Sequence, residues 1–105
     1  MKIRYRARAI SDLEEIYRYL EPRSSTGAGN VLRSIHAAIG ILAVHPHSAE
    51  RTSDPEIRVK VLGRYRYKIF YSVADSDTIE IIHIRHSARR PWQGGDEGST
   101  KGPEQ

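Results

Sequence analysis

The fold is decided by one stretch, Arg58-Val-Lys-Val-Leu-Gly-Arg-Tyr-Arg-Tyr-Lys-Ile-Phe-Tyr71. Apolar and charged residues alternate on both sides of Gly63, which is the pattern of two strands that each bury one face. The glycine marks the turn between them, so the stretch predicts an antiparallel hairpin. We expect one set of alternating side chains to face the interior, namely Ile57, Val59, Val61, Tyr67, Ile69 and Tyr71.

The opposite set of alternating side chains in the hairpin is cationic. If the apolar set faces inward, the other face of the same strands carries Arg58, Lys60, Arg66 and Lys68. Like charges on neighbouring strands repel each other unless water or an anionic partner screens them. The pattern therefore allows either a solvated sheet face or a binding surface for an acidic partner.

A third strand follows the hairpin. It runs from Thr78 to about Arg85, after the turn Asp75-Ser-Asp77, and it is nearly apolar on both faces, as an interior strand is. His83 and His86 are three positions apart at the end of this strand, which places them on opposite faces. The three strands are expected to form an antiparallel meander.

One more strand and a helix open the chain. Apolar and basic residues alternate over residues 2–8, which predicts a first strand. Ser11 and Glu14 match a capping box, and an apolar stripe at helical spacing follows until Pro22, so we expect a helix there. Asp12, Glu14 and Glu15 are interpreted as favourable charges at the start of this helix.

A second helix completes the predicted order. Residues 23–29, rich in Ser and Gly, are expected to form the loop of a helical hairpin, and an apolar helix follows until Pro46. Residues 45–55 contain two prolines and no apolar period, so they are expected to form a connecting loop. The order is β-α-α-β-β-β, and we predict an α+β fold in which the helical hairpin packs on one face of a mostly antiparallel sheet.

Length, charge and composition limit the classes of function. The 105 residues support one domain, over residues 1–92, and the polar remainder 93–105 is predicted to be a disordered tail. Residues 57–92 carry eight basic and three acidic side chains, a net charge of +5, and a positive region suits a phosphate backbone or an acidic protein. The chain has no cysteine and no continuous apolar run at its start, so we expect a cytoplasmic protein without a disulfide, a cysteine–zinc site or a membrane contact.

The segment after the last strand reads His86-Ser-Ala-Arg-Arg-Pro-Trp92. An imidazole beside Arg89 and Arg90 could position and protonate a phosphate, and the tryptophan could stack on a base. Alternatively, His86 hydrogen-bonds the strand end and Trp92 covers the core. No spacing of His, Asp or Glu indicates a metal site, and no glycine-rich phosphate loop is present, so neither metal nor cofactor is expected.

These motifs together resemble the RelE/ParE superfamily of toxins from type II toxin–antitoxin modules. The resemblance rests on the element order, on the stretch over residues 58–71, and on the run Ile79-Glu-Ile-Ile-His-Ile-Arg-His-Ser-Ala-Arg89, and it covers about residues 1–92. If the strand predicted at the start of the chain is counted as the first, an Arg begins the second strand, Tyr-x-Ile-x-Tyr forms the third, and His-x-x-Arg ends the fourth. The loop after the second helix departs from the family, because Pro46-His-Ser-Ala49 stands where Pro-x-x-Gly is usual.

The resemblance implies a small bacterial growth inhibitor that a cognate antitoxin keeps silent, of the kind that stabilises plasmids and chromosomes. RelE-like members cleave mRNA on the ribosome, whereas ParE-like members poison DNA gyrase and lack the nuclease residues. Arg58, Lys60 and Lys68 match the strand cations of RelE-like nucleases, with a Lys at the last position where an Arg is usual. Ser87 stands where a basic residue is expected, and Gln93 stands near the position of the terminal catalytic Tyr. The helical hairpin and the His-x-x-Arg ending resemble ParE-like members more.

Two hypotheses follow. The preferred one is a non-enzymatic toxin that binds gyrase, and its antitoxin, through the sheet face and the last strand. The residues expected to make these contacts are Arg58, Lys60, Arg66, Lys68, His86, Arg89, Arg90 and Trp92. The alternative is a ribosome-dependent, metal-independent mRNA endonuclease, in which His86 is the acid or base. The residues that stabilise the phosphorane would then be Arg58, Lys60 and Lys68.

Overall fold

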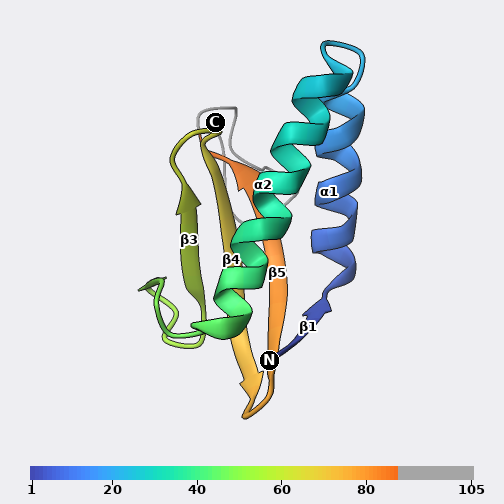
Figure 1. Cartoon of the computed structure of the whole chain (residues 1–105). Coiled ribbons are helices and arrows are strands. Elements are labelled where there is room, and N and C mark those ends of the chain that lie inside the picture. The colour runs from blue at the N-terminus through green and yellow to red at the C-terminus, as the bar shows by residue number, and fades with distance from the viewer. Residues whose placement is uncertain (88–105) are drawn as a thin grey trace.

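The computed structural model describes residues 1–87. Its elements are β1 (Lys2–Tyr5), α1 (Ala7–Leu20), α2 (Ser25–Val44), β2 (Glu50–Arg51), β3 (Arg58–Leu62), β4 (Tyr67–Asp75) and β5 (Thr78–His86). The strands form one sheet in the order β1-β5-β4-β3-β2, with the two helices packed on one face (Figure 1). β1 runs parallel to β5, and the other neighbouring pairs are antiparallel. The predicted α+β fold and its order β-α-α-β-β-β are confirmed; the two-residue strand β2 is an addition within the predicted loop 45–55.

α1 begins at Ala7, earlier than the predicted start at Ser11. The Arg6 amide donates a hydrogen bond to the Ile81 carbonyl at 2.9 Å, so Arg6 still belongs to the sheet and the chain enters the helix directly after it. Arg6 is the N-cap residue and makes no side-chain capping bond. Ser11 therefore lies within the helix, and the predicted capping box with Glu14 is wrong.

α2 begins at Ser25, inside the segment predicted to be a loop. The Ser24 hydroxyl caps it by accepting a hydrogen bond from the Gly27 amide at 2.9 Å. The helix ends at Val44, before Pro46, as predicted. Within residues 1–87, α2 is the one helix with the length and apolar composition to cross a membrane, and seven of its residues are buried in the protein. Buried residues of α2 form part of the core, whereas Ile41 and Val44 of the same helix are exposed.

The core lies between the helices and the sheet. On β4, Tyr67, Ile69 and Tyr71 are at most 2% exposed, which confirms the inward face predicted for this strand. The Tyr71 hydroxyl donates a hydrogen bond to the Pro46 carbonyl at 2.7 Å, and burial raises the pKa of this phenol. The other large buried side chains come from α2 and β5; they are Ile35, Ile39, Leu42, Ile79 and Ile81.

β3 presents the opposite face from the one predicted. Its register pairs Arg58 with Tyr71 and Lys60 with Ile69, and directly opposed residues of an antiparallel pair share a face. The two cations therefore lie on the helix side of the sheet, whereas Val61 is 49% exposed on the other side, which we call the open face. β3 lies near the edge of the sheet, where long side chains can cover the margin of the core and keep their charges in water.

β5 carries one extra residue, Ile82, relative to its partner strand β4. Because of this bulge, Ile81 and Ile84 both face the core although they are three positions apart. His86 continues on the core side of the strand, and His83 lies on the open face. The two histidines are on opposite faces, as predicted.

Candidate functional site

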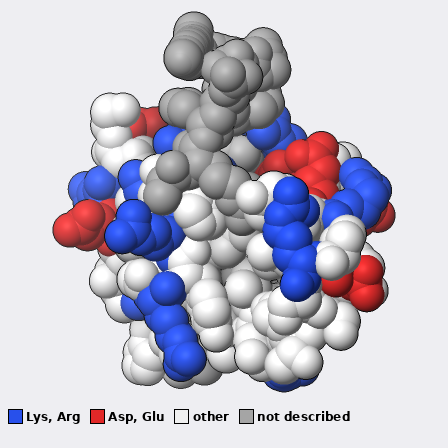
Figure 2. Space-filling view, turned by 90° about the horizontal axis from the view of Figure 1, so that it is seen from above, with Lys and Arg blue, Asp and Glu red and all other residues white. Residues whose placement is uncertain are grey.

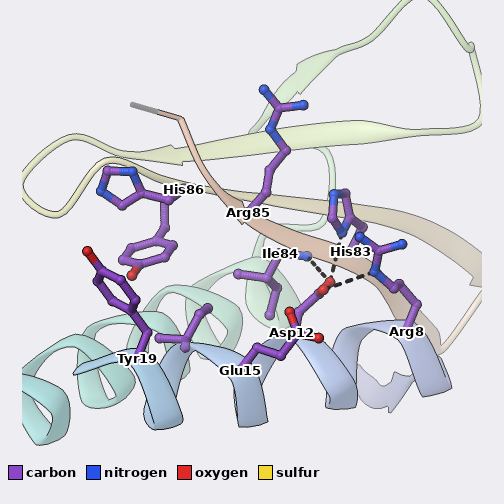
Figure 3. Close-up of a pocket in the computed structure, with 10 residues that line it drawn as sticks. Arg8, Asp12, Glu15, Tyr19, His83, Ile84, Arg85 and His86 are labelled. Carbon is purple, nitrogen blue, oxygen red and sulfur yellow. Dashed lines mark hydrogen bonds and ion pairs between the residues drawn. The ribbon is translucent and has the colours of Figure 1, made fainter. Parts of the chain in front are cut away.

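A hollow lined mostly by polar and charged side chains lies between α1 and β5 (Figure 3). β1 pairs with β5 only as far as Ile81, and beyond that point α1 lies beside the strand instead. We call the resulting hollow the α1–β5 cleft. It has a volume of about 330 Å³ and is lined by Arg8, Asp12, Glu15, Ile16, Tyr19, Tyr67, His83, Ile84, Arg85 and His86.

Asp12 is the central residue of the cleft. It is only 7% exposed, and its Oδ2 accepts a hydrogen bond from the Ile84 amide at 2.9 Å. The same oxygen lies 2.7 Å from His83 Nδ1, while Oδ1 accepts a hydrogen bond from Arg8 Nε at 2.9 Å. Figure 3 shows these three partners converging on one carboxylate. The side chain therefore replaces a neighbouring strand at the edge of β5 and fixes the His83 ring.

The environment of Asp12 favours its charged form. Burial alone would raise its pKa, but the hydrogen bonds from His83, the Ile84 amide and Arg8 outweigh burial and lower the pKa below the usual value. The interpretation of Asp12 as a charge at the helix start is therefore wrong. A signal was present in the sequence, since Asp12 shares the buried side of α1 with Ala9 and Ile16, where an acid needs a partner.

His86 packs against the core instead of gathering with the strand cations. Its ring meets the Tyr67 ring edge-on, with centroids 4.9 Å apart and planes at 87°. Since Arg58 pairs with Tyr71 and His86 with Tyr67, they are separated by about 13 Å along the strands. The histidine and the arginine that the nuclease hypothesis requires in one site therefore lie apart.

Arg58 is used within the fold. Its guanidinium donates hydrogen bonds to the carbonyl oxygens of Ala49 at 2.8 Å and His47 at 3.2 Å. Both carbonyls belong to the loop that follows α2. The side chain therefore ties this loop to β3, from the helix side of the sheet.

The four predicted strand cations do not share one face. Arg58 and Lys60 lie on the helix side and Lys68 on the open face, while Arg66 lies in the turn after β3 with a positive φ of 63°. The Arg66 carbonyl accepts hydrogen bonds from the amide and hydroxyl of Ser87, which ties this turn to the end of β5. Figure 2, seen from above, shows Lys and Arg side chains on both sides of the molecule with uncharged surface between them. The predicted single cationic cluster is wrong.

A different set of groups occupies the open face. Lys68 lies directly opposite Arg85, and the next pair, Phe70 and His83, has stacked rings with centroids 5.6 Å apart and planes at 18°. Farther along, Glu80 forms ion pairs with arginines from the start of the chain, Arg4 at 3.3 Å and Arg6 at 3.2 Å. Sequence reasoning missed Arg85 and His83 because the bulge in β5 changes the side on which they emerge.

Three predicted contact residues, Arg89, Arg90 and Trp92, lie outside the described residues, as does the segment 93–105. Their roles stay predictions. Within residues 1–87, the structure holds no group of three His, Asp or Glu side chains arranged to bind a metal ion.

The fold is similar to those of solved structures. One is described as the chromosomal ParDE system from P. aeruginosa, with a TM-score of 0.61 and 21% identity, covering 82% of this chain and 95% of that one. Another is the isolated E. coli RelE toxin, with a TM-score of 0.55 and 16% identity, covering 84% and 85% of the two chains. At these identities the similarity establishes the fold.

Sequence comparison establishes the family. A curated protein of Sinorhizobium fredii (strain NBRC 101917 / NGR234), named "Putative toxin Y4kP", is 32% identical over 91 residues, which are 87% of this chain and 92% of that protein. Residues 3–91 match the family described as "ParE toxin of type II toxin-antitoxin system, parDE". The chain therefore belongs to the ParE toxin family, within the RelE/ParE superfamily of type II toxin–antitoxin systems.

Proposed function

We propose that this protein inhibits growth by binding and poisoning DNA gyrase in the cytoplasm, and that a cognate antitoxin neutralises it. Membership of the ParE family implies the toxin–antitoxin context and an antitoxin partner. The choice of gyrase over mRNA follows the ParE-like members of the superfamily, which the chain resembles more than the RelE-like nucleases.

One observation carries the choice between the two targets. Metal-independent RNA cleavage needs cations and an acid or base around one phosphate. Here Lys60 lies on the helix side of the sheet, Lys68 lies on the open face, and the Arg58 guanidinium is bonded to loop carbonyls. His86 packs on Tyr67, at the other end of the strands from Arg58. This arrangement supports a toxin that acts by binding.

The charge of the chain suits an acidic antitoxin segment. Residues 57–92 carry a net charge of +5, from eight basic and three acidic side chains. A partly disordered acidic segment that folds onto this part of the toxin would neutralise that charge as it binds. We expect its contacts to include cations of the sheet, and a complex whose footprint avoided Arg58, Lys60, Arg66 and Lys68 entirely would contradict this part of the proposal.

Conditional expression in a bacterial host tests the proposal. Chromosome breakage and mRNA cleavage are measured in the same cultures, with and without co-expression of the antitoxin. We expect growth arrest with broken DNA and intact mRNA, and recovery when the antitoxin is present. Arrest with mRNA cut inside translated codons and unbroken DNA would support the nuclease alternative instead.

A further inference from the structure

Two cations on the open face lack a counter-charge in the described part of the chain. Lys68 and Arg85 are directly opposed on β4 and β5, and both are half-buried. Neither forms an ion pair with a carboxylate within residues 1–87, and the buried Arg85 Nε has no hydrogen-bond partner there. Opposed like charges destabilise a sheet, and a buried donor without an acceptor is costly. An anion bound between the two side chains would offset the repulsion between their charges.

A pair of flat rings lies beside these cations. Phe70 is two residues from Lys68 on β4, and His83 is two residues from Arg85 on β5, so each ring is about 7 Å along its strand from a cation. The two rings are stacked, and Asp12 holds the His83 ring through the 2.7 Å contact with Nδ1. The open face therefore presents rings in fixed orientation next to an anion position.

An apolar hollow continues the surface beyond the rings. Its volume is about 330 Å³, and its lining residues are Arg6, Arg8, Ile57, Phe70, Ile82 and His83. Two acids lie close to this surface: Glu80 is paired with Arg4 and Arg6, and Asp12 is bonded to Arg8, His83 and the Ile84 amide. A cation pair, a ring pair and an apolar hollow with arginines therefore follow one another along the open face. These groups are complementary to the two parts of a nucleotide, a phosphate and a planar base.

We infer that the open face binds a single strand of nucleic acid, with a phosphate between Lys68 and Arg85 and an unpaired base against Phe70 and His83. Unpaired bases can stack on protein rings, whereas the bases of a duplex are stacked on each other. Lys and Arg contacts to phosphates add salt-dependent affinity without base preference. The inference concerns binding without cleavage, and it does not depend on gyrase being the target.

Fluorescence anisotropy with the full-length chain tests this inference. The probes are a labelled oligothymidylate, an oligouridylate of the same length and a DNA duplex. The first variant is Lys68→Gln with Arg85→Gln, the second is Phe70→Leu, and the matched control is Lys60→Gln, which removes a cation from the other face of the same sheet. Melting curves of every variant establish that it is folded.

The expected results are specific to the open face. The double glutamine variant should weaken single-strand binding at least tenfold and reduce the slope of log K against log salt by about 0.7, the contribution of one phosphate contact on a single strand. Phe70→Leu should weaken binding about fivefold or more through lost stacking, and Lys60→Gln should change it less than twofold. The relative affinities of the DNA and RNA strands show which of the two is the better ligand.

Three results would overturn the inference. The first is equal weakening by Lys60→Gln and by the open-face variants, because the binding would then be diffuse. The second is duplex affinity equal to single-strand affinity, because no base would be stacked. The third is that neither oligonucleotide binds, whereas a labelled polyglutamate peptide does bind and Lys68→Gln with Arg85→Gln abolishes its binding. The surface would then be a site for an acidic protein segment. Each result is obtained without gyrase and leaves the proposed target to its own test.

Discussion

The Asp12 carboxylate of α1 accepts a hydrogen bond from the Ile84 amide of β5 at 2.9 Å, across 72 positions of the sequence. It does so where β1 has ended and the edge of β5 would otherwise lack a partner. The contact fastens the helical hairpin to the sheet and also aligns His83, which connects the core to the open face. The stability of the fold and the shape of its open face therefore depend on the same side chain.

Replacing Asp12 by alanine should destabilise the protein strongly. The substitution leaves the Ile84 amide without an acceptor and removes two charge-assisted contacts, with a total cost of about 2–4 kcal/mol. For a domain of this size, the melting temperature should fall by roughly 10 °C or more. Glu14→Ala on the exposed side of α1 is the control and should change stability by at most about 0.5 kcal/mol. Equal melting of the two variants would contradict the role given to Asp12.

The lowered pKa of Asp12 predicts an acid-sensitive fold. A carboxyl group with a lower pKa in the folded state stabilises the protein above its unfolded pKa of about 3.9, and that stabilisation is lost as the pH falls through the folded pKa. The free energy of unfolding, measured in urea, should therefore decrease below about pH 4. In Asp12→Asn the decrease should be smaller, because this group no longer titrates. An identical pH dependence in both proteins would show that other carboxyl groups cause it.

Arg58 should act mainly on stability. Arg58→Ala removes the hydrogen bonds that this partly exposed cation donates to the carbonyls of His47 and Ala49. We therefore expect the free energy of unfolding to fall by about 1–2 kcal/mol. Lys60→Ala removes the neighbouring cation on the same side of β3 and should cost less. Thermal melts of the two variants measure the difference. If Arg58→Ala melts like the parent protein but no longer inhibits growth, Arg58 contacts the target instead.

Replacing His86 should reduce toxicity less than replacing Arg58 and Arg89 together. In a toxin that acts by binding, His86→Ala removes one side chain that packs edge-on against Tyr67, whereas loss of a catalytic acid or base would slow the chemical step by about 10²- to 10⁴-fold. Growth inhibition at matched expression should therefore persist in His86→Ala. Complete loss of toxicity with antitoxin binding intact would contradict the gyrase proposal. The double variant Arg58→Ala with Arg89→Ala is expected to reduce toxicity more.

The order of elements could be predicted because alternation and helical spacing are local properties of the sequence. The same local patterns could not decide which face of β3 turns inward. Val59 and Val61 are the apolar alternates, but the pairing of Arg58 with Tyr71 places the cations on the helix side, and only the register between strands determines this. At a position near the sheet edge, little buried area distinguishes the two faces, so the apolar pattern is a weak guide.

The candidate site was harder to predict because its contacts are long-range. Asp12 could equally be a charge near a helix start, and its true partner, the Ile84 amide, lies 72 residues away. The bulge at Ile82 has no signature in an apolar strand, yet it determines on which face His83 emerges. The start of α1 at Ala7 likewise depends on the hydrogen bond between Arg6 and Ile81, which the alternation of residues 2–8 does not encode.

The most direct test of the gyrase proposal is a cleavage assay with purified components. The full-length chain is added to gyrase, ATP and supercoiled plasmid, and the DNA is analysed after protein denaturation, with ribosome-bound mRNA as a parallel substrate. We predict that linear plasmid accumulates with increasing toxin, that added antitoxin prevents it, and that the mRNA stays intact. Plasmid that remains uncleaved at every toxin concentration, together with cut mRNA, would contradict the proposal.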